Sequence, residues 1–169
     1  TKSHLRISKE EIKSSYYVNE PKIVVCTKTS YLEKYKMLDN IRENGIFILN
    51  TFLSDEELNN YFTDNDKKII KERNIKVYKI NASKIAIDNK INGKINNIIS
   101  TVIFKFIKQV NFDNVLISLK EMIKTKFKNK EKSITESNIK GIDDAINSLT
   151  LVDTSKFSLT GLNLKDDLY

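Results

Sequence analysis

The sequence is poor in the residues that build metal sites, disulfides and most hydrolytic active sites. Its 169 residues include one cysteine, one proline and one histidine, and no tryptophan. A single cysteine, Cys26, excludes a disulfide or a cysteine-based metal site within the chain. The lone His4 has no partner for a zinc site and would have to carry any Ser-His-Asp catalysis alone. These absences argue against zinc-dependent and serine-hydrolase chemistry.

Long apolar runs are also missing. No stretch of about 18 apolar residues exists, so we expect no transmembrane helix and no membrane contact. The first residues, beginning at Thr1 without Met, have no apolar core of a secretory signal. We interpret the sequence as a cytoplasmic piece of a longer protein.

Charge is plentiful but mixed in sign. The chain has 29 Lys and Arg against 22 acidic residues, a net charge of +7 at pH 7. An excess of this kind suggests a nucleic-acid or acidic-ligand surface. However, acidic residues interrupt the lysines, and no basic run alternates with aromatic residues as a stacking platform would. The basic patch from Lys124 to Lys132 is most simply a solvated helix end. We therefore do not expect nucleic-acid binding.

Three short apolar runs are typical of buried parallel strands. They cover Lys22–Cys26, Ile46–Asn50 and Ile75–Ile80, and they are apolar on both faces. Helical stretches separate the three runs. The sequence therefore predicts an α/β fold, a three-layer Rossmann-like parallel sheet with helices on both faces. A doubly wound sheet usually begins with a strand and a Gly-rich loop. Neither is present here, so the sheet is expected to lack its first part.

Helical spacing and capping residues predict seven helices. We place them at Tyr31–Asn40, at an acidic segment whose capping box is Ser54 and Glu57, and at Asn65–Arg73, Ala82–Asn89, Ile95–Ile107, Asp113–Phe127 and Glu136–Leu149. The last three make the C-terminal half rich in helix.

The two ends of the chain give weaker signals. A short strand is expected at His4–Ile7. No period survives in residues 150–169, which we interpret as a tail or linker to another domain. The domain itself is expected to cover residues 1–149.

The start of the Ile95–Ile107 helix is the first candidate site. The turn Asn92-Gly93-Lys94 leads directly into it. Exposed backbone N–H groups and the positive end of the helix dipole favour an anionic or carbonyl-bearing ligand there. The alternative is that Asn and Gly simply cap and turn the chain, and the spacing alone leaves both open.

Five groups of residues, in this order, resemble the gamma-type domain of pyruvate:ferredoxin (flavodoxin) oxidoreductase. They are Ser3-His4-Leu5-Arg6, Val24-Val25-Cys26 followed by Tyr31-Leu32-Glu33-Lys34-Tyr35, Gly45-Ile46-Phe47-Ile48-Leu49-Asn50, Gly93-Lys94-Ile95-Asn96-Asn97, and Asn138 with Asp143-Asp144-Ala145. The resemblance covers about residues 3–149. It departs from the family at Lys94, where the family has Arg, at Asn97, where it has Thr, and at Ile7-Ser8-Lys9, where it has Phe-Gly-Pro.

The resemblance implies a role within a larger enzyme. Enzymes of this family convert pyruvate and coenzyme A (CoA) to acetyl-CoA and CO2, using thiamine diphosphate, Mg and 4Fe-4S clusters, and pass electrons to ferredoxin or flavodoxin. The ligands of these cofactors belong to other domains of the parent chain, so this fragment is expected to bind none of them and to be inactive alone. The gamma-type domain helps to bind CoA and packs against the thiamine domains.

The resemblance also points to residues that contact cofactor or CoA. They are Arg6, Asn50, Lys94, Asn96 and Asn138. Each has a structural alternative, which is an interdomain salt bridge for Arg6, a solvated turn for Lys94, and a turn, a cap or simple exposure for the asparagines. No residue is expected to act as acid, base or nucleophile.

Two other functions remain open on the sequence alone. One is a stand-alone doubly wound module that binds nucleotide or nucleic acid, which needs a Gly-rich phosphate loop that is absent here. The other is a purely structural assembly domain.

Overall fold

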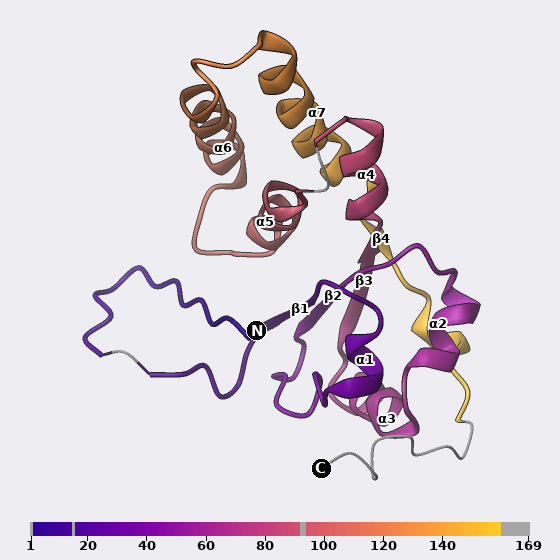
Figure 1. The fold of residues 1–169 in the computed structure, drawn as a ribbon. Helices are drawn as coiled ribbons and strands as arrows, with labels where there is room; N and C mark the ends of the chain where they lie inside the picture. The colour runs from indigo at the N-terminus through magenta and orange to yellow at the C-terminus, as the bar shows by residue number, and fades with distance from the viewer. Residues whose placement is uncertain (1, 15, 92–93, 160–169) are drawn as a thin grey trace.

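A computed structural model describes residues 2–14, 16–91 and 94–159 and places a four-stranded sheet at the centre of the molecule (Figure 1). The strands lie side by side in chain order, and they are β1 (Ile23–Cys26), β2 (Ile46–Asn50), β3 (Lys76–Ile80) and β4 (Thr150–Leu151). The first three strands are parallel, and β4 pairs antiparallel with β3. The three predicted strands and the α/β fold are confirmed.

Helices cover both faces of the sheet, as the sequence predicts. The described helices are α1 (Tyr31–Lys34), α2 (Asp55–Tyr61), α3 (Asp64–Glu72), α4 (Ala82–Asp88), α5 (Asn96–Lys105), α6 (Phe112–Lys126), α7 (Lys132–Ser148) and the short 3-10 helix η1 (Thr154–Lys156). Figure 1 shows α1 and α3 on the lower side of the sheet, α2 to the right of the strands, and the α4–α7 helices above them. Within the described ranges, no helix combines the length and the apolar composition needed to cross a membrane.

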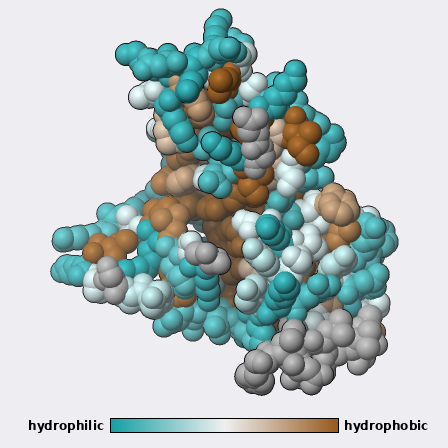
Figure 2. Space-filling model, in the orientation of Figure 1, coloured by the Kyte–Doolittle hydropathy of each residue, from teal (hydrophilic) through white to brown (hydrophobic). Residues whose placement is uncertain are grey.

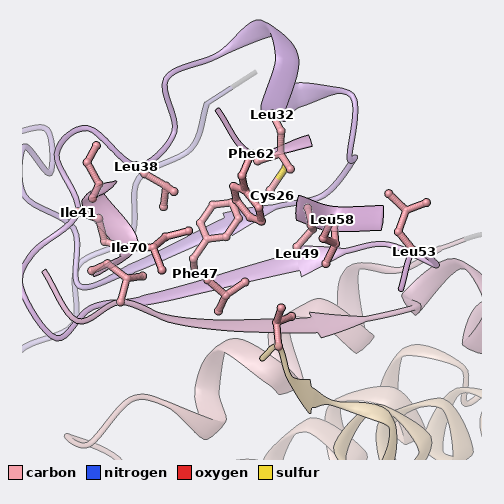
Figure 3. Packing of buried hydrophobic residues seen from close by; sticks show 14 residues of the cluster. Cys26, Leu32, Leu38, Ile41, Phe47, Leu49, Leu53, Leu58, Phe62 and Ile70 are labelled. Atoms are coloured by element: carbon pink, nitrogen blue, oxygen red, sulfur yellow. The ribbon is translucent and has the colours of Figure 1, made fainter. Parts of the chain in front are cut away.

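The central strand β2 divides the interior into two apolar clusters. Side chains alternate between the two faces of a strand. Phe47 and Leu49 therefore enter the cluster between the sheet and α1–α3, and Ile48 enters the cluster between the sheet and α4, α5 and α7. All three are fully buried. Figure 3 shows the first cluster, where the Phe47 ring meets the ring of Phe62 edge to face at a centroid distance of 6.0 Å. Sheet and helices are therefore fixed together through both faces of β2.

The predicted helix at Tyr31–Asn40 is wrong beyond Lys34. The chain leaves the helix at Tyr35, whose backbone is extended with φ of −134°. On a helix, Leu32 and Leu38 would lie about 120° apart and could not both face the sheet. In the structure both are buried, at 1% and 0% exposed. Burial of both leucines therefore requires the irregular segment and overrides the helical spacing.

The short strand expected at His4–Ile7 is absent from the structure. Residues 2–14 and 16–20 form an arm without regular secondary structure, which projects away from the sheet in Figure 1. The hydrogen bonds described for this arm lie within it, such as the one that Val18 N donates to His4 Nδ1 at 3.2 Å. A strand needs a neighbouring strand to accept its ladder bonds, and none is described beside His4.

The chain after Leu149 is more ordered than the sequence signals indicate. Val152 is 3% exposed, and its N–H donates to the Val77 carbonyl at 2.9 Å. Strand β4 has two residues, too few for any period to be read from sequence. Residues 160–169 of the expected tail lie outside the described residues, and the boundary at residue 149 stays a prediction.

The outer edge of β1 has no partner strand within the described ranges. Ile23, Val24 and Val25 are only half-buried, although parallel strands are normally covered on both faces. Figure 2 shows apolar surface between the upper helices and the α1–α3 layer on the same side of the molecule. This side of the sheet is incompletely covered.

A matched pair of phenylalanines tests the role of β2. Phe47→Ala should lower the free energy of unfolding by about 3–5 kcal/mol, because it leaves a cavity in the buried cluster. Phe52→Ala should change it by less than about 0.5 kcal/mol, because Phe52 is 82% exposed. Urea denaturation followed by circular dichroism measures both, and equal losses in the two variants would contradict the assignment.

Candidate functional site

The N-terminus of α5 is the place at which the sequence predicts a candidate site. Ile95 occupies the N-cap position and has no polar side chain to bond the first N–H groups. The first turn of α5 contains no acidic residue, and Lys94 and Asn96 are exposed beside it. Unsatisfied N–H groups and the helix dipole favour an anion at such an end. Asn92 and Gly93 of the predicted turn lie outside the described residues.

Close packing against α7 fixes the position of α5. Ile98, Ile99 and Val102 are buried in the upper cluster. Gly141 of α7 has no side chain, and a Cβ there would lie 2.6 Å from Ile91 Cδ1. The segment that leads into α5 is therefore held against α7 at a distance that only glycine permits without movement of Ile91.

Asn138 lies one helical turn before Gly141 on α7. It is 7% exposed, and its Nδ2 donates to the Ile134 carbonyl of the same helix at 2.8 Å. The amide is thus partly engaged by its own helix.

Asn50 lies at the carboxyl end of β2, the edge at which open α/β sheets bind ligands. Its side chain is buried, and both ends of its amide, Nδ2 and Oδ1, make hydrogen bonds. Nδ2 donates to the Thr27 carbonyl at 3.0 Å and to Ser83 Oγ at 3.4 Å, and Oδ1 accepts from the Ala82 N–H at 2.9 Å. Asn50 therefore ties β1, β2 and the start of α4 together at this edge.

Arg6 lies on the N-terminal arm and bonds within it. Its guanidinium stacks 3.6 Å from the centroid of the Tyr16 ring and donates to the Ser14 carbonyl. His4 packs edge to face on Tyr17 at 5.2 Å. The described contacts do not join Arg6 to α5 or to Asn50. Of the five predicted residues, the described positions and contacts bring together only Lys94 and Asn96, at the start of α5.

A hollow beside the carboxyl ends of β2 and β3 was missed by the sequence analysis. It encloses about 370 Å³, with the exposed ring of Phe52 among its lining residues. Lys79 lies within it and pairs with Asp55 at 2.6 Å while donating to the Leu53 carbonyl at 3.1 Å. This pair holds the pKa of Asp55 below its usual range, with the Lys79 hydrogen bond as the largest cause. The sequence signal that could have revealed this hollow is Lys79, a charged residue within the predicted strand Ile75–Ile80.

A polar cluster between α4 and α7 was also missed. Asn89 is 5% exposed and donates to Asp144 Oδ2 at 2.7 Å. Lys140 donates to Asn89 Oδ1 at 3.2 Å and pairs with Asp144 at 3.3 Å. These hydrogen bonds lower the pKa of Asp144 below its usual range, and the bond from Asn89 is the largest cause. Asp143 pairs with Lys120 of α6 at 2.7 Å. The aspartates of the last family-like motif therefore fasten α4 and α6 to α7.

Comparison with known proteins gives concordant results. A family model described as pyruvate ferredoxin/flavodoxin oxidoreductase matches residues 1–148. The pyruvate:ferredoxin oxidoreductase of Moorella thermoacetica is 32% identical over 149 residues, which cover 88% of this chain and 13% of that protein. The pyruvate dehydrogenase (NADP+) of Cryptosporidium parvum is 34% identical over 157 residues, 92% of this chain and 8% of that protein. The chain thus spans only a small part of the length of these relatives.

A solved structure supports the fold. The pyruvate oxidoreductase subunit PORC of Thermotoga maritima superposes with a TM-score of 0.62 at 17% sequence identity. The match covers 80% of this chain and 67% of the PORC chain. At this identity the likeness concerns the arrangement of helices and strands.

Two asparagines of the predicted site, one buried and one exposed, allow a structural role to be distinguished from a surface role. Asn50→Ala should lower the free energy of unfolding by about 1–3 kcal/mol, because the buried Ala82 N–H and Thr27 carbonyl lose their partner. Asn96→Ala should cost less than about 0.5 kcal/mol, because Asn96 is exposed. Thermal and urea denaturation of both variants measure the difference, and a neutral Asn50→Ala would overturn the structural role.

The α4–α7 cluster predicts a pH dependence of stability. A carboxylate with a lowered folded-state pKa adds stability that is present above its unfolded pKa, about 3.9, and is lost as pH falls through the folded value. The stability difference between the unsubstituted protein and Asp144→Asn should therefore shrink as pH falls below about 4. Urea titrations between pH 7 and pH 3 measure it, and a difference that grows in acid would contradict the assignment.

Proposed function

The chain belongs to the pyruvate ferredoxin/flavodoxin oxidoreductase family, and we propose that it is the domain of such an enzyme that contributes to the CoA-binding surface and to domain assembly. The parent reaction converts pyruvate and CoA to acetyl-CoA and CO2 and passes electrons to ferredoxin or flavodoxin. In this proposal the domain binds and positions, and the bond-breaking steps take place on other domains.

The start of α5 is the observation that carries the CoA part of the proposal. CoA bears phosphate groups, and phosphates bind well at helix N-termini. Lys94 adds a positive charge beside that end, and the exposed amide of Asn96 adds a hydrogen-bond donor in the first turn. Lysine acts on a phosphate as a point charge without the two-pronged geometry of arginine. The departure from the family at this position therefore preserves charge attraction and gives up bidentate geometry.

The residues of this chain do not fit the iron–sulfur clusters of the parent enzyme. A 4Fe-4S cluster is held by four cysteine thiolates, and the whole sequence has only Cys26. Its thiol is buried and donates to the Lys28 carbonyl at 3.0 Å, and burial raises its pKa to about 11. A thiol that remains protonated is not a metal ligand. Other domains would have to hold the clusters.

Thiamine diphosphate and Mg are likewise assigned to other domains of the parent chain. Within residues 2–14, 16–91 and 94–159, no group of three His, Cys, Asp or Glu side chains could hold a metal ion. In the proposal, no step of the pyruvate reaction takes place on this chain.

Two incompletely covered surfaces support the assembly part of the proposal. The outer edge of β1 has no partner strand among the described residues, and its apolar side chains are half-buried. The N-terminal arm exposes Leu5, Tyr16 and Tyr17, which are 65%, 66% and 76% exposed. Contiguous exposed apolar surface marks interaction sites. We assign both surfaces to contacts with other domains of the parent chain.

The two ends of α5 provide a matched test in the parent enzyme. The double variant Lys94→Ala/Asn96→Ala should raise the KM for CoA by about tenfold, the loss of about 1.4 kcal/mol of charge-assisted bonding. The KM for pyruvate should stay unchanged. Lys105→Ala, at the opposite end of the same helix, should leave both constants unchanged.

Two other outcomes would favour the competing functions. An unchanged KM for CoA in the double variant would contradict a CoA contact at α5. It would favour the alternative that the chain is a purely structural assembly domain. Oligonucleotide binding whose logarithm falls steeply with the logarithm of salt concentration would favour a nucleic-acid module.

A further inference from the structure

The turn that follows α4 and leads toward α5 has an unfavourable backbone conformation. Lys90 lies in the left-handed region with φ of 56°, where glycine is the usual residue after a helix. Its N–H donates to the Ile87 carbonyl at 2.9 Å, and the Ile91 N–H donates to the Ala86 carbonyl at 2.8 Å. These two bonds close the Schellman motif of a helix end. Because a side chain with a Cβ disfavours this conformation, contacts outside the turn must help to hold it.

The side chain of Asn89 ties the beginning of this turn to α7, at the place where α4 lies beside α7 (Figure 1). Asn89 is the C-cap residue of α4 and is 5% exposed. Its Nδ2 donates to the Ile85 carbonyl at 3.0 Å and to Asp144 Oδ2 at 2.7 Å, and its Oδ1 accepts from Lys140 Nζ at 3.2 Å. Both donors and the acceptor of the amide are therefore engaged. We call Asn89, Lys140 and Asp144 the α4–α7 clamp.

Ile91 carries the effect of the clamp to the start of α5. It is 8% exposed. A Cβ on Gly141, the residue after Lys140, would lie 2.6 Å from Ile91 Cδ1 and 3.9 Å from Ile98 Cγ1. The end of the turn and the first buried residue of α5 therefore pack on the same face of α7. The Lys94 N–H donates to the Ile91 carbonyl at 3.2 Å, so the position of Lys94 depends on that of Ile91.

Attachment of α4 to the core does not by itself account for the clamp. Ala82, Ile85 and Ala86 already anchor α4 in the upper apolar cluster. The Lys140–Asp144 pair joins side chains that are 67% and 34% exposed, and ion pairs in contact with water add little stability. Hydrogen bonds are directional, whereas apolar contacts are not. The clamp therefore adds a defined position and orientation for the end of α4.

We propose that Asn89 and Asp144 are positioning residues for the anion site at the start of α5. By holding the turn at Lys90, they keep Lys94 and Asn96 where both can meet the phosphates of CoA. This inference rests on the proposed function, because it requires CoA at that end of α5. A site that is fixed in advance binds without a further cost of ordering. When the binding-competent arrangement is populated for only part of the time, the apparent affinity falls by that fraction.

Two substitutions of Asp144 in the parent enzyme test the proposal. Asp144→Ala should raise the KM for CoA about fivefold, with kcat at saturating CoA and the KM for pyruvate unchanged, because only the population of the competent site falls. Removal of a negative charge does not by itself weaken the binding of an anion. Asp144→Asn can still accept the bond from Asn89 and should keep the KM for CoA within about twofold. It loses stability at neutral pH, so a purely structural role would make the KM follow stability in both variants.

Asp88→Ala is the matched control. Asp88 directly precedes Asn89, and its carboxylate pairs with Lys84 at 2.6 Å on the exposed side of α4. The substitution removes the same charge as Asp144→Ala from the same end of α4 and leaves the clamp intact. It should keep the KM for CoA within about twofold of the unsubstituted enzyme. An equal rise in the Asp88 and Asp144 variants would overturn the proposal.

A combination with the α5 variant shows whether the clamp acts through Lys94 and Asn96. In the Lys94→Ala/Asn96→Ala background, Asp144→Ala should change the KM for CoA by less than about twofold, because the groups that it positions are already gone. A further fivefold rise in that background would contradict positioning. Asn89→Ala changes no charge and should repeat the results of Asp144→Ala in both backgrounds, which keeps the test decisive where the Asp144 variant folds poorly.

The same measurements separate this inference from the function on which it rests. An unchanged KM for CoA in Lys94→Ala/Asn96→Ala contradicts the CoA contact at α5 and, with it, the role of the clamp. A raised KM in that variant together with unchanged values in Asp144→Ala and Asn89→Ala contradicts the clamp alone and leaves the proposed function standing.

Discussion

Burial of β2 on both faces is the constraint on which the rest of the structure depends. Phe47 and Leu49 enter one apolar cluster and Ile48 the other, so neither helical layer can leave the sheet without exposing a fully buried side chain. The parallel pairing of β2 with β1 and β3 places the carboxyl ends of all three strands at one edge. Asn50 then joins that edge to α4 by buried hydrogen bonds. The interior therefore acts as a rigid frame.

This frame positions the surfaces on which the proposed function depends. The upper cluster fixes α5, and with it the open N-terminus flanked by Lys94 and Asn96. Polar bonds from Asp143 and Asp144 fasten α6 and α4 to α7, so the helical lobe projects from the sheet as a braced unit. A domain with a stable interior and several incompletely covered surfaces is consistent with one part of a much longer polypeptide.

The proposed surfaces differ in physical character, and each is therefore suited to a different kind of contact. The apolar edge of β1 and the aromatic side chains of the arm suit permanent contacts with other domains, because their burial removes apolar area from water. The α5 N-terminus suits a charged ligand that binds and leaves, because charge attraction weakens with salt and needs little buried area.

Local signals determined much of this protein by themselves. The three parallel strands, the capping box at Ser54 and Glu57, and the long C-terminal helices are confirmed, because each depends on residues close in sequence. Tertiary structure alone decided the rest. The helix beginning at Tyr31 ends early because Leu32 and Leu38 must both reach the sheet, and β4 exists only because β3 offers it an edge. The bonds of Asn50 join residues 23 to 33 positions away. Contacts over such separations leave no periodic trace in the sequence.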